Sequence, residues 1–329
     1  YGVYDGKVYI QDDAKIKGIK AEDDLNGVEI FKLAYKNPET GKITEMKDLT
    51  TETEFSLTTD GEYIVVATDT AGNRREVSLE SLLGISDATT FVIDKDAPVI
   101  ALSDESKKIM DSRVEYNGVK YITDPCDVEY MISDSNLKSF DIGILESPSE
   151  QVKSSIKDNS VVINIPKDCN GTIKYVIRGE DKSSRVTSHT YTLHVDTGNP
   201  VIDNVEVNGE YKEFGGKLYF KSKPTINVTA HDDGSGIKSY KFGDTTNTTG
   251  VFTVGTGFYS LEVFDNVGHT SGVKKLEDCS TLPSSDIVVD SESPTINTSR
   301  PSGDVNGWYA ECPMYSVRLR DNIGVKSAK

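Results

Sequence analysis

Residues 92–100 read Val-Ile-Asp-Lys-Asp-Ala-Pro-Val-Ile, and shortened forms of this segment return at residues 195–202 and 289–296. In each copy an aspartate ends an apolar run, a proline follows four residues later, and a new apolar stretch begins. The aspartates Asp94, Asp196 and Asp290 are separated by 102 and 94 residues. A period of about 100 residues is the size of one β-sandwich domain and exceeds the roughly 20–50 residues of solenoid repeats. The three segments therefore predict domain junctions.

Each period contains further repeated elements that are typical of short strands and hairpins. A Gly-x-x-Tyr element recurs at residues 6–9, 118–121 and 216–219, and glycine favours tight hairpin turns because it adopts positive φ at low cost. A tyrosine opens an apolar strand at Tyr63, Tyr175 and Tyr259, which is the place of the tyrosine corner in immunoglobulin-like sandwiches. Only residues 79–83 read as a helix. Alternating strands with turn signals about every 8–12 residues favour an all-β sandwich.

The order of these elements predicts four segments. We expect an immunoglobulin-like domain at residues 1–93 that lacks its first strand, and complete domains at residues 94–195 and 196–289. Residues 290–329 then form the N-terminal fragment of a fourth domain. The predicted fold class is all-β, with tandem immunoglobulin-like β-sandwich domains in an elongated array. We interpret the sequence as a piece cut from a longer array.

The turn Asp69-Thr-Ala-Gly-Asn73, followed later by Val-Asp-x-x-x-Pro-x-Ile, resembles the tandem bacterial immunoglobulin-like repeats of large cell-surface adhesins. The resemblance covers essentially the whole chain, and its motifs are specific through their ordered recurrence. It is weakest at residues 180–184, where the second copy of the turn has lost its glycine. The resemblance implies a secreted protein located on a bacterial cell surface or cell wall.

Composition and motifs exclude several classes of function. The chain carries 36 Lys and Arg against 53 Asp and Glu, a net charge of −17, so its surface repels nucleic acid and anionic lipid. No apolar run approaches the ~20 residues of a spanning helix, which argues against direct membrane insertion. A nucleophile elbow, a zinc-protease motif and a phosphate-binding loop are all absent from the sequence. We therefore predict that the chain is not an enzyme.

Acidic residues gather at the predicted junctions, and carboxylate oxygens are the ligands that Ca²⁺ takes, roughly six to eight at a time. Similar adhesin repeats and cadherins stiffen their junctions with such ions, so the resemblance implies junctional Ca²⁺ and no other cofactor. The alternative is that Asp and Asn only bond nearby backbone in turns. His231 and His269 lie on neighbouring turns and could meet near Asp232, but a histidine in a loop is more often only a polar turn residue, and we favour that interpretation. The candidate ligands are Asp94, Asp96, Asp134 and Asp181 at the first junction, Asp196, Asp232, Asp233 and Asp265 at the second, and Asp290, Glu292, Asp321 and Asn322 at the third.

Four cysteines raise the question of a disulfide. Placed on the sandwich topology, Cys126 falls before strand B and Cys169 falls in the loop before strand F. Both loops lie at the same end of the second domain, so a Cys126–Cys169 disulfide is geometrically reasonable. The alternative is reduced, partly buried thiols. Cys312 occupies the place of Cys126 in the fourth domain, and Cys279 has no evident partner.

Three functions remain open. The first is a non-enzymatic surface region that binds a host extracellular protein or glycan, such as a glycoprotein, mucin, matrix protein or immunoglobulin. The second is a passive structural stalk, and the third is an accessory region of a secreted glycan-acting or proteolytic enzyme. A stalk predicts interchangeable modules, whereas the modules here differ at the insert 79–89 and at the turn 180–184. We therefore favour ligand binding by a monomeric, elongated chain, with its binding face unassigned.

Overall fold

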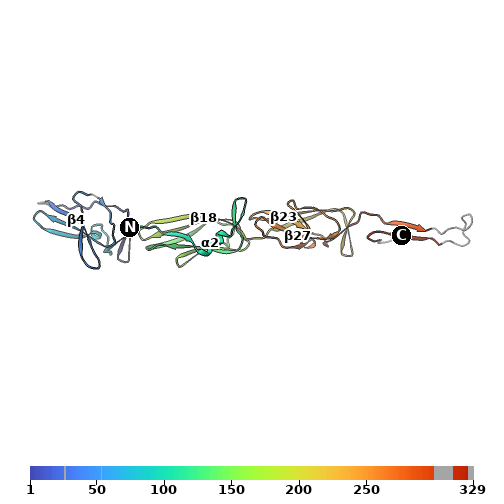
Figure 1. Cartoon of the computed structure of the whole chain (residues 1–329), viewed down its shortest axis with the longest axis horizontal. Helices are drawn as coiled ribbons and strands as arrows, with labels where there is room; N and C mark the ends of the chain where they lie inside the picture. The colour runs from blue at the N-terminus through green and yellow to red at the C-terminus, as the bar shows by residue number, and fades with distance from the viewer. Residues whose placement is uncertain (26, 53, 300–313, 325–329) are drawn as a thin grey trace, which may run out of the picture. The chain divides into compact units, whose positions relative to one another are not determined.

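The computed structural model describes residues 1–25, 27–52, 54–299 and 314–324. The chain is all-β and forms two compact units, one of residues 1–113 with 124–195 and one of residues 114–123 with 196–329. The first unit contains two β-sandwiches, and the second contains a third sandwich followed by a two-stranded segment (Figure 1). The tandem β-sandwich architecture predicted from the repeats is therefore confirmed.

The first sandwich is built around a four-stranded antiparallel sheet whose inner face carries the core residues Phe31, Leu33, Tyr63 and Val65. The strands of this sheet, in order, are β5 (Ile43–Asp48), β4 (Val28–Lys36), β7 (Glu62–Asp69) and β8 (Arg74–Ser78). A second sheet contains β1 (Gly2–Tyr4), β2 (Lys7–Gln11) and β9 (Thr90–Asp94), and a short pair contains β3 (Ile16–Lys17) and β6 (Glu54–Phe55). Helix α1 (Leu79–Leu82) buries Leu79, as the sequence predicts.

The second sandwich has a complete covering sheet of β10 (Val99–Leu102), β13 (Cys126–Ser133), β16 (Ser160–Ile165) and β15 (Lys153–Lys157). The other sheet contains β14 (Leu137–Glu146), β17 (Asn170–Asp181) and β18 (Val186–Asp196). The hydroxyl groups of Tyr130 and Tyr175 lie 2.7 Å apart and join the two sheets inside the core.

The third sandwich packs Phe242, Phe252, Leu261 and Val263 into its core. Strands β23 and β27 lie side by side at its centre (Figure 1). One of its sheets contains β19 (Val201–Asn208), β22 (Thr225–His231) and β25 (Val251–Thr253). A second sheet contains β24 (Thr245–Asn247), β23 (Ile237–Phe242), β27 (Ser260–Asp265) and β28 (Lys274–Lys275). A third sheet contains β20 (Tyr211–Phe214), β21 (Lys217–Phe220), β29 (Asp286–Val289) and β26 (Gly257–Phe258). The second unit also holds the hairpin β11 (Val114–Tyr116) and β12 (Val119–Ile122), helix α3 (Leu276–Cys279), and the pair β30 (Thr295–Ser299) and β31 (Ser316–Arg320).

The repeated local motifs form the structures that their residues predict. Each Gly-x-x-Tyr element opens the second strand of a hairpin, and the turn before it carries two consecutive residues of positive φ, as at Asn117 and Gly118. The Tyr63 hydroxyl donates to the carbonyl of Thr59 at 2.5 Å, and the Tyr259 hydroxyl donates to the carbonyl of Gly255 at 3.2 Å. These two are tyrosine corners. The second sandwich differs, because Tyr175 bonds Tyr130 instead.

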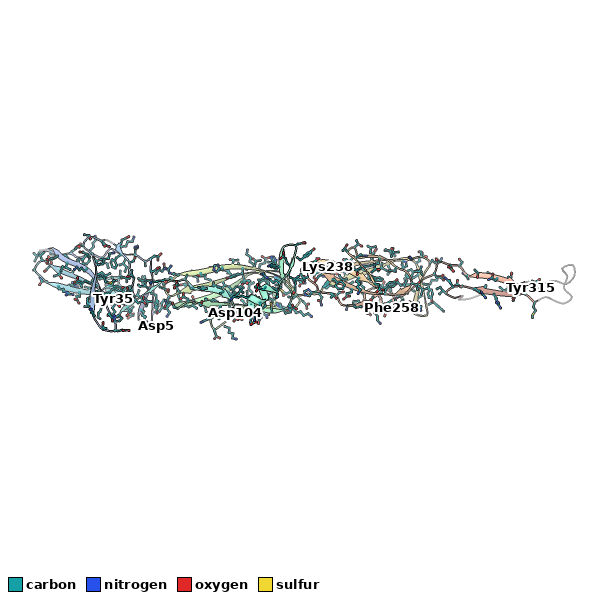
Figure 2. All side chains as sticks on the ribbon, in the orientation of Figure 1. Asp5, Tyr35, Asp104, Lys238, Phe258 and Tyr315 are labelled. Atoms are coloured by element: carbon teal, nitrogen blue, oxygen red, sulfur yellow. The ribbon has the colours of Figure 1, made fainter. Side chains whose placement is uncertain are left out.

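Helix α2 (Asp104–Asp111) is absent from the sequence-based prediction. The Ser103 hydroxyl caps it by accepting from the Ser106 N–H at 3.3 Å, and Asp104, labelled in Figure 2, opens its first turn with Glu105. Acidic residues after a serine cap are favourable at a helix N-terminus. The sequence therefore contains a helix-start signal, but a short polar helix is hard to recognise among so many strands.

The predicted Cys126–Cys169 disulfide is not formed in this structure, which holds both side chains as thiols. Cys126 is not in a loop but is the first residue of β13, where it pairs with Ile165 of β16. Cys169 lies beyond the end of β16, in the connection that leads to β17. Burial raises the pKa of Cys126 to about 11 and also raises the pKa of Cys169, so the reactive thiolate is scarce at both positions. Cys312 lies outside the described residues.

Candidate functional site: buried carboxylate clusters

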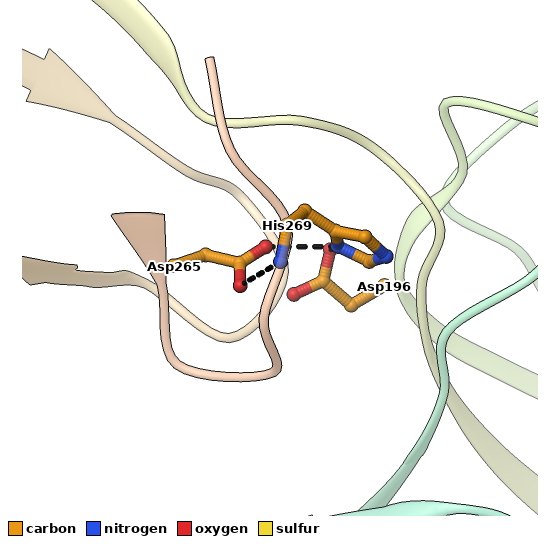
Figure 3. Close-up of side chains that lie close together, drawn as sticks. All are labelled: Asp196, Asp265 and His269. Carbon is orange, nitrogen blue, oxygen red and sulfur yellow. Dashed lines mark hydrogen bonds and ion pairs between the residues drawn. The ribbon is translucent and has the colours of Figure 1, made fainter. Parts of the chain in front are cut away.

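The Asp196 cluster comprises Asp196, Asp232, Asp265 and His269 in the second compact unit. Asp196 is the last residue of β18, Asp265 is the last residue of β27, and His269 follows Asp265 by one turn. The ligand atoms of Asp196, Asp265 and His269 all lie within 4.8 Å of one another (Figure 3). Both carboxylates are fully buried, which makes their hydrogen-bond partners decisive.

Asp265 builds the turn that carries His269. Its Oδ1 accepts the backbone N–H groups of Val267, Gly268 and His269 at 3.0, 2.6 and 2.8 Å. Gly268 adopts a φ of +114° that other residues rarely reach. The carboxylate therefore fixes the backbone of the turn, and its second oxygen, Oδ2, lies 2.9 Å from Nδ1 of His269.

His269 is positioned as an imidazolium. Its Nδ1 faces the Asp265 carboxylate, and its Nε2 lies 2.9 Å from the backbone carbonyl of Thr123. Both partners can only accept hydrogen bonds, so both ring nitrogens must carry protons. Burial alone lowers the pKa of His269, but the Thr123 carbonyl, Asp265 and Asp196 outweigh it, and the net shift is upward.

Two oxygens of the Asp196 cluster are buried without a hydrogen-bond partner among the described residues, namely Asp196 Oδ1 and Asp232 Oδ2. Asp196 Oδ2 accepts from the Ser235 N–H at 2.7 Å, and Asp232 Oδ1 accepts from Gly234 and Gly236. Burial raises the pKa of Asp232, and the nearby Asp196 and Asp265 raise it further. Orphaned buried carboxylate oxygens are costly, and a cation or a proton relieves that cost.

The Asp94 cluster, in the first compact unit, comprises Asp94, Asp134 and Asp181, whose charges act on one another but whose ligand atoms do not all lie within 4.8 Å of one another. Asp94 ends β9 and Asp181 ends β17, and both are buried. Asp181 Oδ1 accepts from the Ser183 hydroxyl and the Arg185 N–H, each at 2.8 Å. Asp94 Oδ2 and Asp181 Oδ2 have no hydrogen-bond partner in the described part of the chain. Burial raises the pKa of Asp94, and Asp181 and Asp134 add to that shift.

Arg185 takes the position in the second sandwich that His269 takes in the third, because each follows the turn aspartate by four residues. The Arg185 guanidinium forms an ion pair with Asp12 and lies 3.4 Å from the backbone oxygen of Asp94. It therefore ties the second sandwich to the first. In the first sandwich the same position holds Asn73, whose amide donates to Asp69 at 2.7 Å.

The remaining predicted ligands lie apart from these clusters. Asp96 and Asp233 are exposed, as are Glu292 and Asn322. Asp290 accepts the Glu292 N–H, and Asp321 accepts the N–H groups of Ile323 and Gly324. Within the described residues, Asp290 and Asp321 do not converge with a third ligand atom. These aspartates behave as the turn residues of the alternative reading.

The sequence analysis placed His269 near Asp232 but did not count it among the candidate site residues. The signal was its register, because Arg185 and His269 are both cationic residues four positions after a buried turn aspartate. His231, the other histidine considered, is exposed and pairs with Asp203 at 2.6 Å, so it takes no part in the cluster.

Sheet order, hairpins and tyrosine corners together define the class of tandem immunoglobulin-like β-sandwich proteins. No protein-family model and no curated protein sequence matches the chain. The chain is similar to solved structures, including that of protocadherin gammaB7 extracellular domains 3–6 (14% identity, TM-score 0.29, 90% of this chain and 74% of that chain). It is also similar to the insect immune protein hemolin (11% identity, TM-score 0.30, 88% of this chain and 76% of that chain). A further similar structure is that of a Ca²⁺-stabilised, ice-binding adhesin of an Antarctic bacterium (14% identity, TM-score 0.24, 88% of this chain and 74% of that chain).

The fold assignment rests on the strand order described above. Among the described residues, the helices are too short and too polar for any of them to cross a membrane. The clusters offer carboxylate oxygens, which are a donor set suited to holding a hard cation.

Proposed function

We propose that this chain is a non-enzymatic adhesive region of a bacterial surface protein, in which Ca²⁺ bound at the carboxylate clusters fixes the geometry of an array that binds a host extracellular protein or glycan. The observation that supports the proposal is the repeated junction aspartate. Asp94 and Asp196 both end a strand, both are buried, and both keep one oxygen without a hydrogen-bond partner in the described part of the chain.

The Asp94 cluster fits Ca²⁺ on the chemistry of its donors. Asp94 and Asp181 each offer an unpartnered oxygen, and Asp134 lies close enough to raise the pKa of Asp94. Three like charges in a desolvated site repel one another unless a cation or a proton intervenes. At neutral pH a hard divalent cation resolves the repulsion of all three carboxylates, whereas one proton neutralises only one of them.

The Asp196 cluster fits Ca²⁺ in competition with a proton. Asp196 Oδ1 and Asp232 Oδ2 are the available oxygens, but Nδ1 of His269 lies 3.8 Å from that Asp196 oxygen. An imidazolium beside the site repels a metal cation. Calcium binding at the Asp196 cluster should therefore weaken as the pH falls, and binding at the Asp94 cluster should change less.

Host binding is supported by the difference between the modules. Among the described residues, the sheet of the first sandwich that contains β3 and β6 has only these two two-residue strands, whereas the corresponding sheet of the second sandwich contains the four strands β10, β13, β16 and β15. A passive spacer needs no such divergence. The third alternative, an accessory region of an enzyme, has no observation of its own that favours it.

A pull-down tests the proposed binding. Immobilised residues 1–329 are exposed to serum and to mucosal secretions, first with calcium and then with a chelator, and the retained proteins are identified by mass spectrometry. The proposal predicts a saturable, dominant host glycoprotein whose retention falls with the chelator. If the chain retains only the proteins that an unrelated acidic protein also retains, in both conditions, the passive stalk remains as the function.

A further inference from the structure

The first sandwich contains a groove of about 660 Å³ over the inner face of its main sheet. Its lining includes the apolar side chains of Val28, Phe31, Val65, Ala67 and Val77. A smaller hollow of about 320 Å³ shares Phe31 and the segment Ile19–Glu22 with it. The apolar side chains of a sandwich interior are thus left partly open at this position.

In the other two sandwiches the first strand of the sandwich, β10 or β19, occupies the position that corresponds to this groove. Strand β13 lies between β10 and β16, and β22 lies between β19 and β25. Strand β3 corresponds to β13 and β22, since each follows a Gly-x-x-Tyr hairpin along the chain. Within the described residues, however, β3 pairs only with β6. The buried pair Ile16–Phe55 matches the buried pair Ile226–Phe252 of the third sandwich, so the edge of β3 that has no pairing strand among the described residues is the one on the side taken by β10 and β19 in the other sandwiches.

The second sandwich shows how that strand covers the main sheet. Pro98, just before β10, packs against Gly179 of β17 so closely that a Cβ at Gly179 would lie 3.0 Å from the Pro98 Cβ. Gly179 precedes the turn aspartate Asp181 by two residues. The residue two before the turn aspartate Asp69 is Ala67, and Ala67 lines the groove.

The rim of the groove matches the start of such a strand. Asp69 lines the rim together with Asp23, which accepts the N–H groups of Leu25 and Gly27 as Asp232 accepts those of Gly234 and Gly236. In the other sandwiches these turns surround the junction aspartates Asp94 and Asp196. Charged side chains of both signs also line the groove, namely the cations Lys20, Arg74 and Arg75 and the carboxylates Glu22, Asp23 and Asp69.

We propose that this groove binds an extended segment of the type Asp-x-x-x-Pro-x-Ile, the sequence that leads into β10 and β19. The segment adds as an antiparallel strand to the open edge of residues 16–22, places its proline over Ala67, and buries its following apolar residues in the groove. Backbone hydrogen bonds supply affinity, and the alternate side chains supply specificity. The inference depends neither on calcium nor on the host ligand.

A labelled peptide tests the inference on the full chain. The probe is residues 94–103 of this sequence, Asp-Lys-Asp-Ala-Pro-Val-Ile-Ala-Leu-Ser, and its binding to residues 1–329 is followed by fluorescence anisotropy. We expect saturable binding that weakens at least about tenfold when the peptide carries Ile100→Asp, because that change places a charge in an apolar groove. The peptide variant leaves the protein unchanged, so folding cannot account for the loss.

Two protein variants and a cross-link locate the binding. Ala67→Trp fills the groove and should abolish binding, whereas Ala71→Trp, at an exposed position of the neighbouring turn, should bind within about twofold of the unchanged chain. A photoreactive group at the proline of the peptide should label Ala67 or its neighbours on β7. Equal binding of the Ile100→Asp peptide, or labelling of β13 or β22 through exchange with β10 or β19, would overturn the proposal.

Discussion

Replacing Asp265 with alanine removes the carboxylate that holds both the turn 265–269 and the His269 ring. Three backbone N–H groups lose their acceptor, and the imidazole loses the partner that lies 2.9 Å from Nδ1. Asp265 is fully buried, so water replaces these bonds poorly. Breaking a buried charge pair by removing one partner costs about 3–5 kcal/mol. We expect the third sandwich to lose about that much free energy of unfolding.

Hydrogen exchange measured by mass spectrometry reports the stability of each sandwich separately, whereas a global unfolding curve combines all of the domains. Amides of β27 should exchange about 100-fold faster or more in Asp265→Ala, since each 1.4 kcal/mol is a tenfold change. The matched control is Asp69→Ala. Asp69 makes the same turn contacts to Ala71 and Asn73, but it is half-exposed and solvent can replace them. Equal acceleration in the two variants would refute the claim that burial of Asp265 sets the magnitude.

Three further predictions concern single side chains. Tyr259→Phe should lower the free energy of unfolding by about 1 kcal/mol, because it removes one neutral hydrogen bond. Tyr175→Phe should lower it by about 1–3 kcal/mol, because it leaves the buried Tyr130 hydroxyl unpaired. Hydrogen exchange measures both losses in their own sandwiches, and equal losses would contradict this difference. The pKa of His269 is raised in the folded chain, so its stabilising contribution is complete below its unfolded pKa of about 6.5 and disappears as the pH rises through the folded value. In chelator, His269→Gln should therefore lower the melting temperature at pH 6 more than at pH 9, and an equal lowering at both pH values would contradict this assignment. Burial raises the pKa of Cys126 to about 11, so a thiol reagent at pH 8, followed by peptide mapping, should label Cys126 slowly in the native chain and rapidly after denaturation. Labelling of Cys126 that appears only on adding a reductant would contradict the free thiol.

The sequence predicted the repeats, the hairpins and two of the three tyrosine corners, because each depends on local residue types at fixed spacing. Asn117-Gly118 and Gly215-Gly216 adopt positive φ at low cost, which a two-residue hairpin turn requires. The positions of Asp94 and Asp196 at the ends of apolar strands followed from the same logic, whereas the burial of their carboxylates was not predicted.

Features that depend on contacts distant in sequence were not predictable. The protonated state of His269 requires the carbonyl of Thr123, which lies 146 residues away. The pairing of Cys126 with Ile165 places that thiol on a strand rather than in a loop, and no local signal specifies it. Asp96 and Asp233 are chemically equal to their neighbours Asp94 and Asp232, and only the fold directs them to solvent.

The most direct test of the calcium-stabilised array is the number of ions bound by the folded chain. Native mass spectrometry of residues 1–329 at pH 7.5, across a calcium titration, should detect two specific ions. Asp94→Asn should remove one ion and Asp196→Asn the other, while the exposed neighbours in Asp96→Asn and Asp233→Asn should retain both. The account would be contradicted if the chain binds no more calcium ions than magnesium ions at the same concentration. It would also be contradicted if neither Asp94→Asn nor Asp196→Asn loses an ion.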